Sequence, residues 1–143
     1  MSFGFCNLTL SIRRRMNIPD NLLYTKEHEW ASVKGKEATI GITDYAQGSL
    51  GDITFVDVPK QGAALEQFKQ CATVESVKAA SDVYAPLSGK VIKVNAELSK
   101  HPELVNQSPY EKGYFAVIEI KDEKEKSKLM SAADYKKYVE NLK

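Results

Sequence analysis

The sequence is poor in the residues from which metal centres, disulfide frameworks and hydrolytic active sites are built. It holds two cysteines and two histidines among 143 residues, namely Cys6, Cys71, His28 and His101. Their spacing matches neither a zinc site nor a disulfide-rich fold. The sequence also lacks a GxSxG elbow, a Walker loop and a dinucleotide-binding fingerprint. These absences disfavour a self-sufficient enzyme, and we expect a non-catalytic protein.

No charge of one sign dominates the chain, and no apolar run is long. The 20 basic and 19 acidic residues leave a formal net charge of +1, which gives no electrostatic footprint for nucleic acid or an anionic membrane. The apolar runs are far shorter than the ~20 residues that a membrane-spanning helix needs. The hydrophobic content of 43% is ordinary for a globular protein. We therefore expect one folded domain whose partners are neither nucleic acid nor membrane.

Residues 1–15, MSFGFCNLTLSIRRR, differ in composition from the rest of the chain. They contain no acid and end in three arginines, a composition that weakly matches a transit peptide. Met16 follows directly and would also make a natural start. Two compartments stay open: the bacterial cytoplasm if Met16 is the true start, and the mitochondrial matrix if the segment is a presequence. We divide the chain into an N-terminal extension, residues 1–21, and a folded domain, residues 22–143.

From residue 22 onward the apolar residues recur mainly with a period of two, which is typical of β-strands. Gly35 lies between two alternating runs and predicts a hairpin turn. Thr43 or Asp44 is expected to cap one or two helical turns that end at Gly48. Further strands are expected within residues 51–59, 71–76, 79–86, 87–95 and 113–120. Many short strands with small turns favour a barrel or a flattened sandwich.

The C-terminal stretch, residues 122–143, has a different pattern and is predicted to be helical. Ser131 and Asp134 have the spacing of a capping box. One face of the helix that follows carries Tyr135, Tyr138, Val139 and Leu142. We expect this apolar stripe to pack against the β-structure.

One lysine, Lys78, lies between two strand-like runs, CATVES and AASDVYAP. Lys78 is therefore expected at or beside the tip of a hairpin, with its amine in solvent. The small residues Ala79 and Ala80 follow it, so an enzyme could reach the amine from several sides. Acylation would remove the charge and make the lysine the base of a long arm, as biotin and lipoamide carriers require. A lysine at a turn is also an ordinary solvent-facing residue, and position alone does not decide between these interpretations.

The sequence around Lys78, VESVKAASDVYAPLSGKVIKVN, resembles the lipoylation site of the glycine cleavage system H-protein family. Three other stretches are similar to the same family, in the family's order: YTKEHEW, IGITDYAQGSLGDITFVDVP and ELVNQSPYEKGYFAVIEI. The resemblance covers residues 22–142. It implies that the folded domain is a lipoyl-binding H-protein domain, mainly β with C-terminal helices. The implied fold is a barrel-sandwich hybrid of two small sheets with pseudo-twofold symmetry.

The resemblance implies a non-catalytic carrier with lipoic acid attached to Lys78. Its lipoyl arm would accept an aminomethyl group when a pyridoxal-phosphate-dependent glycine decarboxylase releases CO₂. The arm would then present this group to a tetrahydrofolate-dependent aminomethyltransferase and be reoxidised by a flavin-dependent dihydrolipoamide dehydrogenase. Lipoylating enzymes are the remaining implied partners. Because one arm visits several enzymes, we expect a monomer with small polar contact patches.

The resemblance also implies a cleft that protects the loaded arm. An aminomethyl adduct would break down in water, and its cationic amine suits a carboxylate-lined cleft. The family's acids match Glu29 and Asp82, and His28 is a further candidate for lining the cleft. Glu27 stands where family members often have a small polar residue, and it adds a negative charge nearby. From the residues alone, Glu29 and Asp82 could equally be solvent-facing acids, and His28 a packed side chain.

Several other kinds of protein share part of this pattern. A biotin carrier is disfavoured, because Val77 and Ala79 flank the lysine where methionines would be expected. Lipoyl domains of 2-oxo-acid dehydrogenases precede a flexible linker and a catalytic domain, and neither is seen here. An H-like protein that relays lipoyl groups to other enzymes would carry all of these motifs. An unmodified binding module of the same fold also stays open.

Overall fold

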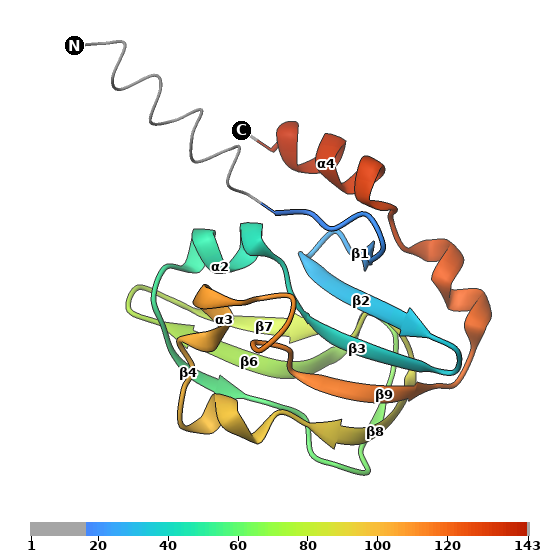
Figure 1. The fold of residues 1–143 in the computed structure, drawn as a ribbon, viewed down its shortest axis with the longest axis horizontal. Helices are drawn as coiled ribbons and strands as arrows, with labels where there is room; N and C mark the ends of the chain where they lie inside the picture. Colours follow the sequence, from blue (N-terminus) through green and yellow to red (C-terminus); the bar gives the residue numbers. More distant parts are fainter. Residues whose placement is uncertain (1–16, 143) are drawn as a thin grey trace.

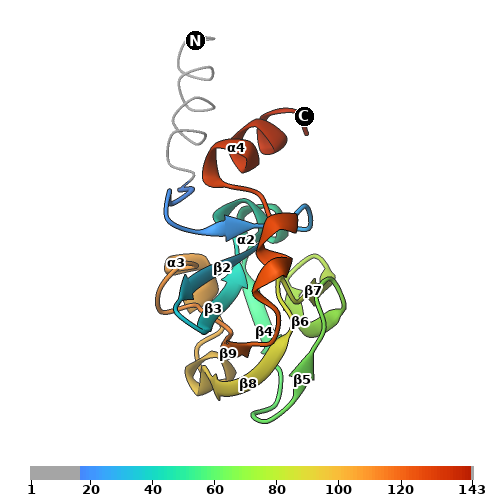
Figure 2. The same cartoon turned by 90° about the vertical axis from the view of Figure 1, so that its right-hand side faces the viewer.

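In the computed structural model, residues 17–142 are described, and they fold into two antiparallel β-sheets with short helices around them (Figures 1 and 2). The expectation for residues 1–15 lies outside the described residues. The predicted fold class is confirmed: the chain is mainly β, with two sheets and C-terminal helices. The sheets differ in size, with six and three strands, and they do not close into a barrel.

The longer strands lie within or close to the ranges predicted from the sequence, and neighbouring strands in each sheet are antiparallel. The larger sheet has the order β1-β2-β3-β9-β8-β5. Its strands are β1 (Leu23–Tyr24), β2 (Glu29–Lys34), β3 (Glu37–Ile42), β9 (Ala116–Ile120), β8 (Gly89–Val94) and β5 (Ala64–Leu65). The smaller sheet has the order β4-β6-β7. Its strands are β4 (Ile53–Asp57), β6 (Gln70–Ser76) and β7 (Ala80–Tyr84).

The predicted hairpin around Gly35 is confirmed. Strands β2 and β3 pair directly up to the turn, and Gly35 has a φ of 61°, a left-handed value that glycine adopts at little cost. Further along β3, Gly41 lies under the buried Trp30 ring, and a Cβ at Gly41 would come within 2.9 Å of it. The indole nitrogen of Trp30 donates a hydrogen bond to the Ile42 carbonyl at 2.9 Å. The glycine therefore lets a large aromatic side chain lie flat on the neighbouring strand.

Helix α2 (Asp44–Leu50) begins where the sequence predicted but ends later. The Thr43 hydroxyl accepts a hydrogen bond from the Ala46 amide at 3.2 Å, which confirms the predicted cap. The predicted end at Gly48 is wrong, because one glycine inside a helix costs only about 1 kcal/mol and need not stop it. The helix ends at Gly51, whose φ of 81° turns the backbone away while its amide still bonds to the Gln47 carbonyl.

The C-terminal stretch is helical only in part. A 3₁₀ helix, η2 (Glu123–Lys128), comes first, and α4 (Ala132–Glu140) follows. Between them the backbone is extended, because Met130 exchanges two backbone hydrogen bonds with Tyr24. Ser131 caps α4 by accepting the Asp134 amide at 3.2 Å, as predicted. The predicted stripe is partly wrong, since Leu142 lies beyond the helix and is 41% exposed.

Three groups of buried apolar side chains hold these elements together. One lies on the six-stranded sheet, and a second joins the three-stranded sheet to η1 (Ala96–Ser99) and α3 (Leu104–Gln107). The third fixes α4 against β1 and β2 through Tyr24, Trp30, Tyr135 and Val139. Among residues 17–142, no helix is long and apolar enough to cross a bilayer. The turn between β6 and β7 lies at one end of the smaller sheet, where it can project (Figure 1).

Candidate functional site

Lys78 lies in the tight turn that joins β6 and β7, the position expected from the sequence. The last paired residues are Glu75 and Ala80. The turn is closed by a 2.7 Å hydrogen bond from the Ser76 amide to the Ala79 carbonyl. The Ser76 hydroxyl also accepts hydrogen bonds from the amides of Lys78, at 3.3 Å, and Ala79, at 3.1 Å. Ser76 thus fixes the backbone of the turn at Lys78 and Ala79, and the lysine side chain is exposed.

The surroundings of Lys78 leave its amine accessible. The Val77 amide donates a hydrogen bond to the Asp52 carbonyl at 3.1 Å, which ties the turn to the start of β4. The Lys78 stem passes near the C-terminal end of α2, since a Cβ at Gly51 would lie 3.8 Å from its Cε. Within the described part of the chain, no carboxylate lies within 4.0 Å of the lysine amine. Lys78 is therefore an exposed primary amine on a fixed turn, free of any ion pair there.

Glu29, at the start of β2, is a buried carboxylate with only 2% of its surface exposed. The Thr25 hydroxyl donates a hydrogen bond to one of its oxygens, and the Tyr84 amide donates to the other at 3.2 Å. The Glu29 amide in turn donates to the Thr25 hydroxyl at 3.1 Å. Glu29 thus connects the two sheets through its hydrogen bonds. The alternative interpretation from the sequence, that Glu29 is a solvent-facing acid, is therefore wrong.

Burial dominates the electrostatics of Glu29. Loss of hydration raises the pKa of its carboxyl to about 7, and the nearby charge of Glu27 adds to this rise. The hydrogen bonds from Thr25 and from the Tyr84 amide act in the opposite direction, because they stabilise the ionised form. The carboxyl consequently changes its charge near neutral pH. A cation placed beside it would favour the ionised form.

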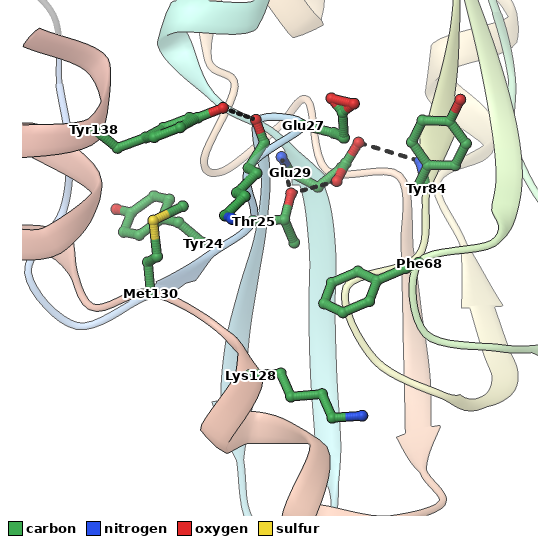
Figure 3. A pocket seen from close by; sticks show the side chains of 10 residues that line it. Tyr24, Thr25, Glu27, Glu29, Phe68, Tyr84, Lys128, Met130 and Tyr138 are labelled. Atoms are coloured by element: carbon green, nitrogen blue, oxygen red, sulfur yellow. Dashed lines mark hydrogen bonds between the residues drawn. The ribbon is translucent and has the colours of Figure 1, made fainter. Parts of the chain in front are cut away.

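Glu29 borders a cavity of about 630 Å³, shown in Figure 3. The cavity is lined by Tyr24, Thr25, Lys26, Glu27, Glu29, Phe68, Tyr84, Lys128, Met130 and Tyr138. The carboxylates come from the segment around β2, whereas Phe68 and Tyr84 project from the opposite side. Of the remaining six lining residues, Tyr24, Met130 and Tyr138 are aromatic or apolar, and Thr25, Lys26 and Lys128 are polar or basic. The two lysines are exposed and balance the two carboxylates in formal charge, whereas Glu29 is buried. The part of the cavity around Glu29 and the aromatic side chains therefore suits a molecule with an apolar body and a cationic end.

The cavity and the lysine turn are connected by one strand. Strand β7 begins two residues after Lys78 and ends at Tyr84, whose amide bonds Glu29. Asp82, in the middle of this strand, does not line the cavity. Its carboxylate is exposed and accepts a hydrogen bond from the Gln70 side chain at 3.0 Å. Of the residues singled out from the sequence, the structure therefore brings Glu29 into the cavity and leaves Asp82 on the outer surface of the sheet.

His28 points away from the cavity, towards α4. Its Nδ1 lies 2.8 Å from the Tyr135 hydroxyl, which is also 2.7 Å from the Thr43 hydroxyl. The ring packs on Tyr45 with centroids 4.4 Å apart. Burial lowers the pKa of His28 to about 4, so the imidazole is neutral at neutral pH. Neutral Nδ1 can accept the Tyr135 proton, and Tyr135 can then accept that of Thr43. His28 therefore acts as a packing residue that joins α4 to the start of α2.

This burial predicts an acid-sensitive contribution to stability. The unfolded chain binds a proton on His28 below about pH 6.5, whereas the folded chain binds it only near pH 4. The contribution is thus complete above pH 6.5 and is lost as the pH falls towards 4. We expect parent protein to lose about 1–2 kcal/mol relative to His28→Asn between pH 7 and pH 4.5. Asparagine suits the left-handed backbone at this position, where φ is 72°.

Urea unfolding of both proteins at the two pH values measures this difference. Subtracting the variant from the parent cancels the titration of Glu29, which both proteins share. An equal loss of stability in parent and variant would show that His28 does not titrate on unfolding.

Five further residues of the site were not found from the sequence. Thr25 and Tyr84 bond to Glu29, Phe68 lines the cavity, and Lys128 and Met130 close it from the segment before α4. Thr25 lies four residues before Glu29, and this spacing gave no signal, because the intervening residues form a turn rather than a helix. Phe68 gave no signal either, because the residues around it, AALEQFKQC, contain none of the usual turn formers.

The site offers few groups for chemistry of its own. Among residues 17–142, no group of three or more histidine, cysteine or acidic side chains is arranged to hold a metal ion. Burial raises the pKa of Cys71 to about 12, with the charge of Glu29 as a smaller cause, so the thiol is not reactive at neutral pH. What remains is an accessible amine and a separate cavity that suits a cation.

Comparison with known proteins identifies the family. Residues 22–142 match the glycine cleavage H-protein family. A glycine cleavage system H protein of Halothermothrix orenii is 50% identical over 127 residues, covering 89% of this chain and 99% of that protein. One from Bacillus cereus is 52% identical over 120 residues, covering 84% and 94%. The crystal structure of a glycine cleavage system H protein from Mycobacterium marinum superposes with a TM-score of 0.74 at 29% identity, covering 87% of this chain and 98% of that one. The chain therefore belongs to the glycine cleavage system H-protein family.

Proposed function

We propose that this protein is the lipoyl carrier of the glycine cleavage system, with lipoic acid attached to Lys78. In this role it takes the aminomethyl group of glycine from the decarboxylase to the aminomethyltransferase, and passes electrons to dihydrolipoamide dehydrogenase. The observation that carries the proposal is the exposed amine of Lys78, which has no ion-pair partner among residues 17–142, on a turn fixed by Ser76. Family membership supports the glycine cleavage system as the setting.

The residues present fit a lipoyl group. An amide at Lys78 needs an amine that a ligase can approach, and small residues follow it in the turn. When bound, the lipoyl group supplies a redox-active disulfide on a long flexible chain. The cavity lies at the other end of β7, and Glu29 can hold a cationic amine there through a charge-assisted hydrogen bond. Phe68, Tyr84 and Met130 limit the access of water to that carboxylate.

The chain's own part is to bind and protect, and the partner enzymes carry out the bond-making steps. The protein is thus proposed to be non-catalytic. Residues 22–143 are proposed as the carrier domain and residues 1–21 as an extension. The relatives reported above are bacterial, which favours the bacterial cytoplasm over the mitochondrial matrix. N-terminal sequencing of the native protein would decide between the two compartments.

The first test is the mass of the intact protein after expression in a lipoate-competent host. We expect a shift equal to one lipoyl amide, mapped to Lys78 by peptide sequencing. A Lys69→Arg variant is a matched control, because Lys69 is also exposed but lies at the far end of β6. It should carry the same modification. Fully unmodified protein in such a host would favour a binding module that kept the fold without the cofactor.

A relay of lipoyl groups to other enzymes is distinguished by growth. A deletion strain should fail to use glycine as a one-carbon source, while its 2-oxo-acid dehydrogenases remain lipoylated. Loss of lipoylation on those dehydrogenases would instead point to the relay.

A further inference from the structure

Phe68 occupies a backbone position that suits glycine. The Lys69 amide donates a hydrogen bond to the Glu66 carbonyl at 3.1 Å, so residues 66–69 form a turn with Phe68 in third place. Its φ is 65°. A turn with a positive φ at this place favours glycine or asparagine, because other side chains are strained there. A large aromatic residue is therefore kept where the local conformation disfavours it, a pattern that points to a role for the side chain.

The turn is clamped from the other side, so the position of Phe68 is fixed. Its amide donates a hydrogen bond to the Ala85 carbonyl at 2.7 Å, and the Ala85 amide donates to the Lys69 carbonyl at 2.9 Å. Ala85 directly follows Tyr84, the residue whose amide bonds Glu29. Figure 3 shows the Phe68 ring pointing from this loop into the cavity, towards the wall formed by Tyr24 and Met130. Phe68 as a whole residue is 47% exposed despite its large apolar side chain.

The exposed ring lies beside the buried carboxylate, so the cavity presents an apolar surface and a site for a cation next to each other. We propose that Phe68 is a positioning residue: its ring forms the apolar wall against which the hydrocarbon part of the arm on Lys78 packs while the cationic end of the arm meets Glu29. This inference rests on the proposed function. The arm is the occupant because it is tethered to the same hairpin that forms this wall, which gives it a high effective concentration at the cavity.

Three variants test the proposal. Phe68→Asn removes the ring and suits the turn, Phe68→Tyr keeps the ring, and Phe55→Asn is a matched control. Phe55 is 49% exposed and lies on β4, outside the cavity lining. Intact mass first establishes that each protein carries one lipoyl group on Lys78. Each is then loaded with glycine and the decarboxylase, separated from it, and followed for release of ammonia without the aminomethyltransferase.

We expect Phe68→Asn to release ammonia about tenfold faster than the parent, because loss of half-buried aromatic contact shifts the arm towards solvent. Phe68→Tyr and Phe55→Asn should stay within about twofold of the parent. A second readout is the backbone amide resonance of Tyr84, which should shift on loading in the parent and not in Phe68→Asn. The urea midpoint of Phe68→Asn should stay near that of the parent, because relief of the strained turn offsets the lost packing.

Equal release from Phe68→Asn and the parent would overturn the inference, and so would equally fast release from Phe68→Asn and Phe68→Tyr. A Tyr84 resonance that shifts on loading in Phe68→Asn as it does in the parent would also overturn it, because the arm would then reach the cavity without the ring. Absence of any lipoyl group on the parent would instead refute the proposed function, on which this inference depends. The mass measurement therefore separates the two failures.

Discussion

Replacing Lys78 by arginine is expected to abolish the glycine-dependent activity of the reconstituted system, by at least about a thousandfold. The side chain keeps its positive charge, but a guanidinium stays protonated and cannot form the amide that holds the arm. The fold should be unaffected, because Lys78 is exposed and its Nζ takes part in no hydrogen bond or ion pair within residues 17–142. Exposed substitutions of this kind change stability by about 0.5 kcal/mol or less.

The activity is measured as glycine-dependent CO₂ release coupled to NADH formation with the three partner enzymes present. Lys69→Arg serves as the control, with the same chemical change on an exposed lysine in the turn just before β6. It should keep full activity. Turnover by Lys78→Arg at the parental rate would show that the arm is attached elsewhere, and the carrier role of this lysine would have to be abandoned.

The position of Lys78 could be predicted because it depends on local sequence. Two strand-like runs separated by only two residues, Val77 and Lys78, leave room only for a tight turn, and the pairing of Glu75 with Ala80 confirms that turn. The hairpin around Gly35 and the cap at Thr43 were predictable for the same reason. Each depends on residues within a few positions of one another, where turn chemistry and capping act.

The state of Glu29 depends on contacts between distant parts of the chain. Its hydrogen-bond partner Tyr84 lies 55 residues away, and the cavity is closed by Met130 and Tyr138 from the C-terminal segment. A period-two pattern marks Glu29 as the start of a strand, but it does not show which face a second sheet will cover. The end of α2 was also predicted wrongly. The helix ends through the backbone conformation of Gly51 and continues past Gly48, and the sequence does not show which of the two glycines ends it.

The position of the His28 side chain could not be predicted from the sequence either. It adjoins Glu29 in the sequence, yet its φ of 72° turns the side chain to the opposite side, where it meets Tyr135 on α4. In a regular strand, the side chains of neighbouring residues point to opposite faces of the sheet. Here the left-handed backbone at His28 sets the direction of the imidazole instead. Nothing in the sequence HEW predicts this conformation for a histidine.

Glu29→Gln is expected to remove a large pH dependence of stability. The pKa of Glu29 is raised from 4.5 in the unfolded chain to about 7 in the folded protein. The folded state therefore binds the extra proton between these values. The stability that this proton provides is complete below pH 4.5 and is lost as the pH rises through 7. The parent should lose about 3 kcal/mol relative to Glu29→Gln between pH 4 and pH 8.

Urea unfolding at both pH values gives this difference, and the titration of His28 cancels because both proteins keep it. Glu27→Gln is the matched control: Glu27 lines the same cavity but is exposed, so its own loss should change the slope only slightly. A parent and a Glu29→Gln variant whose stabilities run parallel from pH 4 to pH 8 would show that Glu29 titrates as an ordinary carboxyl. Glu29 would then be fully ionised near neutral pH, whether or not the cavity is occupied. With the raised pKa, in contrast, Glu29 is only partly ionised near neutral pH and becomes fully ionised when a cation binds beside it.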